Sequence, residues 1–118
     1  MSHRRRGLAV VRVTGASMEP TLREGDLLLI RYGAPPLLGS IVVARLPRDR
    51  DGMPRPVSVK RLTSRDPADP GRWWVERDNP AVGADSWLFG SIGDDDVLAR
   101  VVCRIWPRPG RRDVGPRR

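Results

Sequence analysis

The chain of 118 residues carries a formal net charge of +8 and contains one cysteine, one histidine and one lysine. This length suits a single domain, and the single Cys103 and His3 exclude an intrachain disulfide, a His-dependent triad, a Cys–His pair and a His-based zinc site. Terminal arginines account for the whole net charge (three at residues 4–6 plus five beyond residue 107, with Asp113 offsetting one), so charge does not predict specific nucleic-acid binding.

Short apolar runs separated by Gly, Pro and Asp predict a mainly β protein. The expected strands are residues 8–14, 27–32, 41–46, 57–62, 72–76 and 97–106. The single helical candidate is a short turn at residues 18–23, where Pro20 suits the first helical turn. Strands of this length predict a compact barrel-like or sandwich β domain.

The domain is expected to span residues 8–107, between a disordered basic N-terminus at 1–7 and a disordered Arg-, Pro- and Gly-rich tail at 108–118. No segment approaches the roughly 20 apolar residues of a membrane-spanning helix. The apolar run that begins at Leu8 is stopped by Arg12, short of a signal-peptide core. We therefore expect a cytoplasmic protein with no membrane anchor.

Lys60 is the first candidate for chemistry. Arginine stays protonated at any accessible pH, whereas a buried lysine can lose its proton and act as a base. Burial in the apolar run around it would lower the pKa of Lys60. Strand alternation turns Lys60 away from Val57 and Val59, however, so its apolar cover must come from elsewhere, for which Met18, residues 27–30 and the tryptophans are candidates.

Ser17 is the expected partner of Lys60. A serine hydroxyl is a weak nucleophile until a base removes its proton, and no usable histidine is present. Gly15 and Ala16 leave the approach to the hydroxyl open, and an oxyanion hole in this turn would use backbone N–H groups, chiefly that of Ser17. The local sequence leaves one alternative open, in which Ser17 only caps a helix at residues 18–23.

Taken in order, several motifs resemble those of the signal peptidase I and LexA-like serine–lysine peptidases. They are Gly15-Ala16-Ser17-Met18-Glu19-Pro20-Thr21-Leu22, Gly25-Asp26-Leu27, Gly39-Ser40-Ile41, Val59-Lys60-Arg61-Leu62, Trp74-Val75-Glu76-Arg77-Asp78-Asn79-Pro80 and Asp85-Ser86-Trp87-Leu88-Phe89-Gly90. The resemblance covers about residues 10–107 and implies a largely β fold, with Ser17 as nucleophile and Lys60 as general base.

The same resemblance implies further roles around this pair, and it implies no metal or cofactor. The expected oxyanion turn is Gly15, Ala16 and Ser17. The residues expected to contact substrate or to support the pair are Met18, Pro20, Asp78, Asn79, Asp85 and Ser86.

Three positions depart from the wider family pattern. The usual Gly-Asp-Asn begins with Arg77, and the usual Asp-Ser-Arg ends with Trp87, so Asp85 is expected to lack the arginine that pairs with it there. A serine that often helps to hold the lysine amine falls at Gly83. These departures leave Ser17 and Lys60 in place.

Within this group the chain looks most like the short proteases that mature nickel-type superoxide dismutase, partly through residues 30–35. That resemblance implies a propeptide-bearing nickel superoxide dismutase as partner, bound as an extended peptide along a strand edge with small side chains before the cut. The alternatives are a peptide-binding relative with impaired catalysis, a signal peptidase-like protease acting on another precursor, and a small basic β-barrel that binds nucleic acid.

Overall fold

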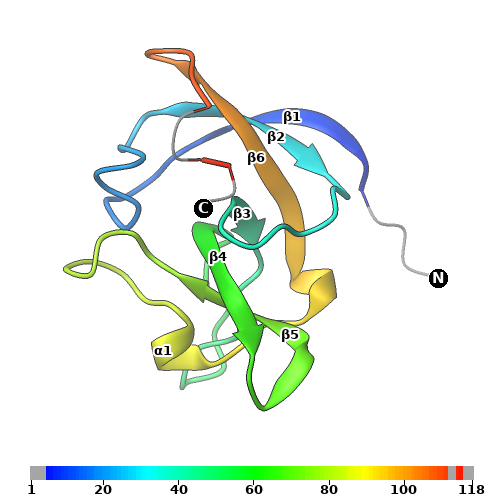
Figure 1. The fold of residues 1–118 in the computed structure, drawn as a ribbon. Helices are drawn as coiled ribbons and strands as arrows, with labels where there is room; N and C mark the ends of the chain where they lie inside the picture. Colours follow the sequence, from blue (N-terminus) through cyan, green and yellow to red (C-terminus); the bar gives the residue numbers. More distant parts are fainter. Residues whose placement is uncertain (1–4, 112–113, 116–118) are drawn as a thin grey trace.

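The computed structural model describes residues 5–111 and 114–115. Its strands are β1 (Gly7–Arg12), β2 (Leu27–Tyr32), β3 (Ile41–Ala44), β4 (Ser58–Asp66), β5 (Asp69–Glu76) and β6 (Val97–Trp106), and its α-helix is α1 (Ser86–Phe89), all labelled in Figure 1. The 3-10 turn η1 (Asp94–Asp96) precedes β6. The prediction of a mainly β fold is confirmed. No helix in the described part of the chain has the length and apolar character needed to span a membrane.

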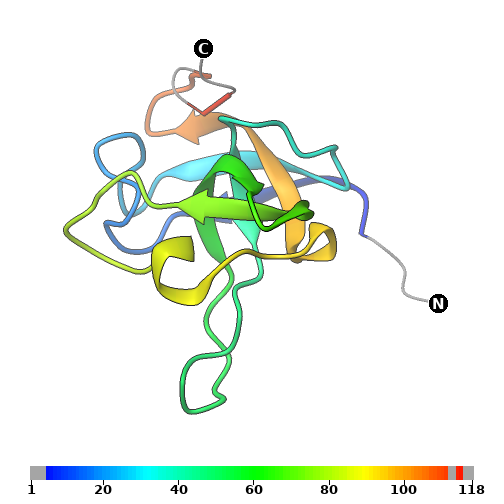
Figure 2. The same ribbon diagram turned by 60° about the horizontal axis from the view of Figure 1, so that its bottom comes forward.

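The strands form one six-stranded sheet in the order β1-β2-β6-β3-β4-β5, and every neighbouring pair is antiparallel. Register shifts interrupt the β2–β6, β3–β6 and β4–β5 ladders, and such bulges increase the local twist and bend of a sheet. Figure 2 shows β5 lying across the direction of β6, and the long β3–β4 connection projecting away from the sheet.

The β3 strand is buried on both of its faces. Its alternating side chains point to opposite sides, so Ile41 and Val43 join one hydrophobic cluster while Val42 and Ala44 join another. The first cluster also contains Met18, which anchors the turn that carries Ser17. The register pairs Val42 directly with Lys60 of β4. The two expected catalytic residues are therefore tied to the best-buried part of the sheet.

The structure corrects several expected strand ends. The third strand stops at Ala44, while β4 and β5 run on to a tight hairpin at residues 66–69 that the Pro- and Gly-containing sequence was expected to leave as a loop. The hairpin forms because Asp66 and Asp69 accept hydrogen bonds from the main-chain N–H groups of Ala68 and Gly71. Since β5 is an edge strand, a proline within it removes no required ladder bond.

The expected helical turn at residues 18–23 is present only as a single hydrogen-bonded turn that does not continue into a helix. The Leu22 N–H does reach the Met18 carbonyl at 2.9 Å, but the next N–H, that of Arg23, donates to the Asp26 carboxylate at 2.9 Å and the helix does not propagate. The α-helix lies instead at α1, where Asp85 caps the first turn by accepting from the Trp87 N–H. The alternative role of Ser17 as a helix cap is thereby excluded.

The described parts of both chain ends make contacts with the domain. Val114 is buried in the first cluster, its carbonyl accepts from the Ile41 N–H at 3.0 Å, and Gly110 pairs with Arg104. One apolar residue suffices to dock this part of the tail, although the composition around it is polar. At the other end, Gly7 begins β1, and the Arg5 guanidinium lies 4.6 Å from the centre of the Tyr32 ring. Residues 1–4, 112–113 and 116–118 lie outside the described part.

Candidate active site

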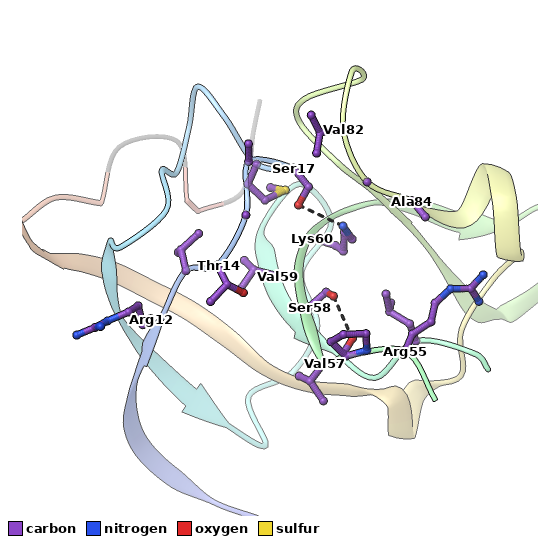
Figure 3. Close-up of a pocket in the computed structure, with 17 residues that line it drawn as sticks. Arg12, Thr14, Ser17, Arg55, Val57, Ser58, Val59, Lys60, Val82 and Ala84 are labelled. Atoms are coloured by element: carbon purple, nitrogen blue, oxygen red, sulfur yellow. Dashed lines mark hydrogen bonds between the residues drawn. The ribbon is translucent and has the colours of Figure 1, made fainter. Parts of the chain in front are cut away.

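Ser17 and Lys60 come together although 43 positions separate them in the chain. The Lys60 Nζ lies 3.4 Å from the Ser17 Oγ, within hydrogen-bonding distance, and Figure 3 shows the two side chains pointing toward each other. Ser17 follows β1 in a turn, whereas Lys60 belongs to β4. The lysine is 3% exposed and the serine half-buried. A buried amine next to an accessible hydroxyl is the geometry that an activated serine requires.

The turn that presents Ser17 is held at both ends. On its N-terminal side Val13 exchanges main-chain hydrogen bonds with Asp26 and Gly25, at 2.9 and 2.8 Å. Gly15 has a φ of +78°, a conformation that glycine adopts without strain. Immediately after the serine, Met18 is 2% exposed within the first cluster. Among the described residues, the Ser17 N–H has no hydrogen-bond acceptor, so it is available to a ligand.

Asn79 clamps the Ser17 turn from the opposite side. Its main-chain N–H donates to the Ser17 carbonyl at 2.8 Å, and its side-chain Nδ2 donates to the Ala16 carbonyl at 2.9 Å. The Oδ1 of the same side chain accepts from the Ala81 N–H at 3.1 Å. One residue thus connects the nucleophile turn to the segment at 79–84.

The pKa of Lys60 lies below its ordinary value, chiefly because burial disfavours the ammonium. The neighbouring Asp85 carboxylate acts in the opposite direction and raises the pKa, while the Arg77 guanidinium lowers it further. Of the expected sources of apolar cover, Met18 lines the same cleft as Lys60; residues 27–30 and the tryptophans do not. The balance of burial and two charges therefore decides the protonation of the amine.

Gly83 covers the pair. A Cβ on this residue would lie 3.0 Å from the Ser17 Cβ and 3.9 Å from the Lys60 Nζ, and the φ of Gly83 is +89°. A serine side chain at this position would meet both steric and conformational obstacles. Because Gly83 has no side chain, its backbone packs directly against Ser17 and Lys60.

Asp85 does have an arginine partner, contrary to the expectation from the motif. The Arg77 Nη1 lies 3.4 Å from the Asp85 Oδ2, and the Arg77 main-chain N–H donates to the same oxygen at 3.2 Å. Because β5 ends beside the start of α1, an arginine directly after β5 can reach the carboxylate that caps the helix. The arginine that replaces the usual glycine thus supplies the guanidinium that Trp87 does not.

Asp78 forms a second, more buried ion pair behind the turn. Arg61, 3% exposed, donates to both of its carboxylate oxygens, at 3.3 and 2.7 Å, and also to the Gly39 carbonyl at 2.9 Å. The Thr21 hydroxyl donates to Asp78 at 2.5 Å. This network ties the end of the Ser17 turn to β4, beside Lys60.

A cleft of about 440 Å³ opens at Ser17 and Lys60. It runs between the segment after β1 and the segment leading into β4, as Figure 3 shows, and the 82–84 segment borders it. The cleft is lined mainly by small and apolar residues. Its uncharged lining residues are Val13, Thr14, Gly15, Ala16, Ser17, Met18, Leu46, Pro56, Val57, Ser58, Val59, Val82, Gly83 and Ala84. Its basic lining residues are Lys60, Arg12 and Arg55. Among the described residues, no carboxylate lines it.

Comparison with known proteins identifies the family of this chain. The model of the family described as Peptidase S24-like matches residues 1–102. The chain belongs to the Peptidase S24-like family. Curated relatives include mitochondrial inner membrane protease subunit 1 of Mus musculus, 30% identical over 115 residues (83% of this chain and 69% of the relative). The Schizosaccharomyces pombe protein of the same name is 30% identical over 117 residues (81% and 72%). The family and these relatives support a serine-type peptidase.

In this Peptidase S24-like chain the expected site residues fall into three groups. Gly15, Ala16 and Met18 line the cleft with Ser17 and Lys60, while Asp78, Asn79 and Asp85 brace it from behind. The remaining two lie apart from the cleft. Ser86 accepts from the Val75 N–H at 2.8 Å on the β5 side, and Pro20 borders a separate cavity beside Asp78.

Sequence reasoning missed the two arginines that pair with the bracing carboxylates. Arg61 carried a usable signal, because it lies between apolar residues of an expected strand and a buried charge needs a partner. Arg77 was noted only as a departure from the family pattern. Nothing in the local sequence indicates that it reaches Asp85, since the intervening loop decides that contact.

Proposed function

We propose that this chain is a serine endopeptidase in which Ser17 is the nucleophile and Lys60 the general base. The observation that carries the proposal is the 3.4 Å contact between the Ser17 Oγ and the Nζ of Lys60, a residue that is only 3% exposed. Because burial lowers the pKa of Lys60, the neutral amine with its free lone pair is populated nearer to neutral pH than for an exposed lysine.

In the proposed reaction, the Ser17 Oγ attacks the scissile carbonyl carbon as its proton moves to the Lys60 Nζ. The resulting oxyanion accepts a hydrogen bond from the Ser17 main-chain N–H. The C–N bond then breaks, Lys60 returns the proton to the leaving amine, and an acyl ester remains on Ser17. Water attacks this ester with Lys60 again as the base, which releases the carboxylate product and restores the hydroxyl.

The cleft supports an extended peptide as substrate. Gly15, Ala16, Gly83 and Ala84 border it next to the nucleophile, so small side chains on the peptide fit beside the scissile bond. Segments on both sides of the cleft offer main-chain groups along which an extended chain can pair. We propose the propeptide of a nickel-type superoxide dismutase precursor as substrate, and its support is the motif resemblance together with this narrow cleft.

The similarity to mitochondrial inner membrane protease subunit 1 favours a second candidate, a signal peptidase-like protease that acts on another precursor. Both candidates share the Ser17–Lys60 chemistry and differ in the protein that enters the cleft. A peptide-binding relative with impaired catalysis would bind the same extended segment without cutting it.

Mass spectrometry of intact precursors tests these alternatives. Nickel superoxide dismutase precursor and a panel of signal-peptide-bearing precursors are each incubated with wild-type, Ser17→Ala and Lys60→Arg proteins. We expect one cut by the wild type only, because Lys60→Arg keeps the positive charge but cannot supply a neutral base. Cleavage by Lys60→Arg at the wild-type rate would overturn the mechanism. Binding without cleavage in all three proteins would favour the peptide-binding role.

A further inference from the structure

Arg77 contacts the loop between β5 and α1 that lies behind Lys60. Its Nη1 pairs with the Asp85 Oδ2 at 3.4 Å, and its Nη2 donates to the Pro80 carbonyl at 3.1 Å. Its Cδ lies 3.8 Å from the point that a Cβ on Gly83 would occupy. The guanidinium therefore binds Pro80 and Asp85 of the loop between β5 and α1, and the aliphatic part of the same side chain passes beside Gly83.

The burial of Arg77 is a second observation. Its side chain is 23% exposed, and its Nε is buried without a hydrogen-bond partner among the described residues. Buried polar atoms without partners are rare because each one has lost its hydration without compensation. The contribution of Arg77 to stability therefore explains its presence here poorly. The groups that its side chain holds in place offer a better explanation.

We propose that Arg77 is a positioning residue of the peptidase, one that holds the 79–85 loop and the Asp85 carboxylate so that Lys60 works as a base. This inference rests on the proposed function. The guanidinium fixes Pro80 and Asp85 and thereby seats Gly83 against Ser17 and Lys60. Asp85, only 4% exposed, is kept engaged with Arg77 and the start of α1.

The electrostatic consequence has a definite sign. Asp85 stabilises the Lys60 ammonium, and Arg77 destabilises it. Removing the guanidinium would abolish its repulsion of the ammonium and strengthen the attraction by Asp85, so both changes would keep Lys60 protonated to higher pH. The other charged groups around the cleft are Arg12 and Arg55, which line it, and Arg61, which follows Lys60 in β4 and is paired with Asp78.

The sequence provides an unusually clean probe, because Lys60 is its only lysine. Protein labelled with [ε-13C]lysine gives one side-chain signal, whose pH titration reports Lys60 without any substrate. The variant is Arg77→Gln. The matched control is Arg104→Gln, because Arg104 is also partly exposed (31%) and also pairs with a buried aspartate, Asp26, at 3.6 Å, but does not act on Lys60.

We expect the Lys60 titration midpoint to move to higher pH in Arg77→Gln and to stay at the wild-type position in Arg104→Gln. The acid limb of kcat/KM on the cleaved precursor should move by the same interval, with a loss of roughly three- to tenfold near neutral pH. An unchanged NMR midpoint in folded Arg77→Gln would overturn the proposal, even if activity fell. If the wild type cuts no precursor, the proposed function fails, while the NMR comparison still decides the role of Arg77.

A second variant covers the case in which Arg77→Gln does not fold. Arg77→Lys keeps a cation beside Asp85 but cannot reach the Pro80 carbonyl at the same time. We expect its acid limb to remain close to that of the wild type while kcat/KM falls, because charge is kept and loop positioning is weakened. Full wild-type kcat/KM in Arg77→Lys would overturn the positioning role.

Discussion

A Cβ atom on Gly83 would lie 3.0 Å from the Cβ of Ser17, closer than about nine in ten Cβ contacts in folded proteins. The same point lies 3.9 Å from the Lys60 Nζ. Position 83 therefore sets the distance between the covering loop and the two residues that we assign to catalysis. The backbone of Gly83 packs against Ser17 and Lys60, and the charges of Arg77 and Asp85 act on the same lysine.

Gly83→Ala should impair peptidase activity more than it impairs folding. The added methyl group must displace the 82–84 segment or the Ser17 side chain, and misplacement of a catalytic group by about 1 Å can reduce the rate by about a hundredfold. Gly52→Ala is the matched control, because Gly52 also has a positive φ (+79°) but nothing within 4 Å of its Cβ position. Equal kcat/KM values for the two variants would contradict this relationship, and thermal unfolding measures their shared conformational strain.

Lys60→Met should raise stability at low pH and lose that advantage as the pH rises. The lowered pKa means that the unfolded chain binds the lysine proton more tightly than the folded protein does. The stability of the wild type therefore increases with pH between the pKa of Lys60 in the folded protein and its pKa in the unfolded chain. Below the folded-state pKa, the buried ammonium destabilises the folded protein by its full amount. Urea unfolding at a series of pH values below the ordinary lysine pKa of about 10.4 measures this difference. A stability gain in Lys60→Met that stays the same at every pH would contradict this expectation.

Asn79→Asp should damage the nucleophile turn more than Asn79→Ala. Both remove the Nδ2 donor that bonds the Ala16 carbonyl, but aspartate also places a carboxylate oxygen against that carbonyl. The main-chain bond from Asn79 to the Ser17 carbonyl remains in both. We expect the free energy of unfolding to fall by about 1–3 kcal/mol in the alanine variant, because a buried hydrogen-bond partner is removed. We expect a lower kcat in both variants. Wild-type kcat in Asn79→Asp would show that the clamp does not position Ser17.

Arg61→Met should be strongly destabilising, whereas Arg45→Met should not. The Arg61–Asp78 pair is almost fully buried, and removing its guanidinium leaves a buried carboxylate poorly compensated, at a cost of about 3–5 kcal/mol. The Arg45–Asp96 pair is exposed and 3.8 Å long, and such pairs contribute about 0–1 kcal/mol. Denaturant unfolding of both variants measures the contrast. Similar free energies of unfolding would show that the buried network is not structural.

Ending the chain after Pro109 should destabilise the protein, because this removes Val114 from the first cluster and Gly110 from its pairing with Arg104. Val114→Ala in the full chain should cost about 1–2 kcal/mol through lost burial of the side chain. Thermal unfolding of both proteins provides the measurement. Unchanged melting of the truncated chain would mean that this contact is not stable in solution.

The strand pattern was readable from the sequence because alternation and β-branched composition are local properties. Residues 27–32 and 97–106 form strands with the predicted bounds, and both lie in the interior of the sheet, where burial enforces the pattern. Local rules failed where contacts with distant segments decided the outcome. The turn after Ser17 uses Asp26 and Asp78 in place of helical bonds, and no 18–23 window contains that information.

The sequence by itself singled out Ser17 and Lys60, since the scarcity of His and Cys excluded other serine and thiol chemistry and the ordered motifs pointed to one family. Only the tertiary structure decided what surrounds them. It placed Arg77 on Asp85, Gly83 over Ser17, and Val114 under β3. The physical reason is that charge pairing, close packing and burial depend on which segments are in contact in the folded protein. The local sequence around each residue does not specify these long-range contacts.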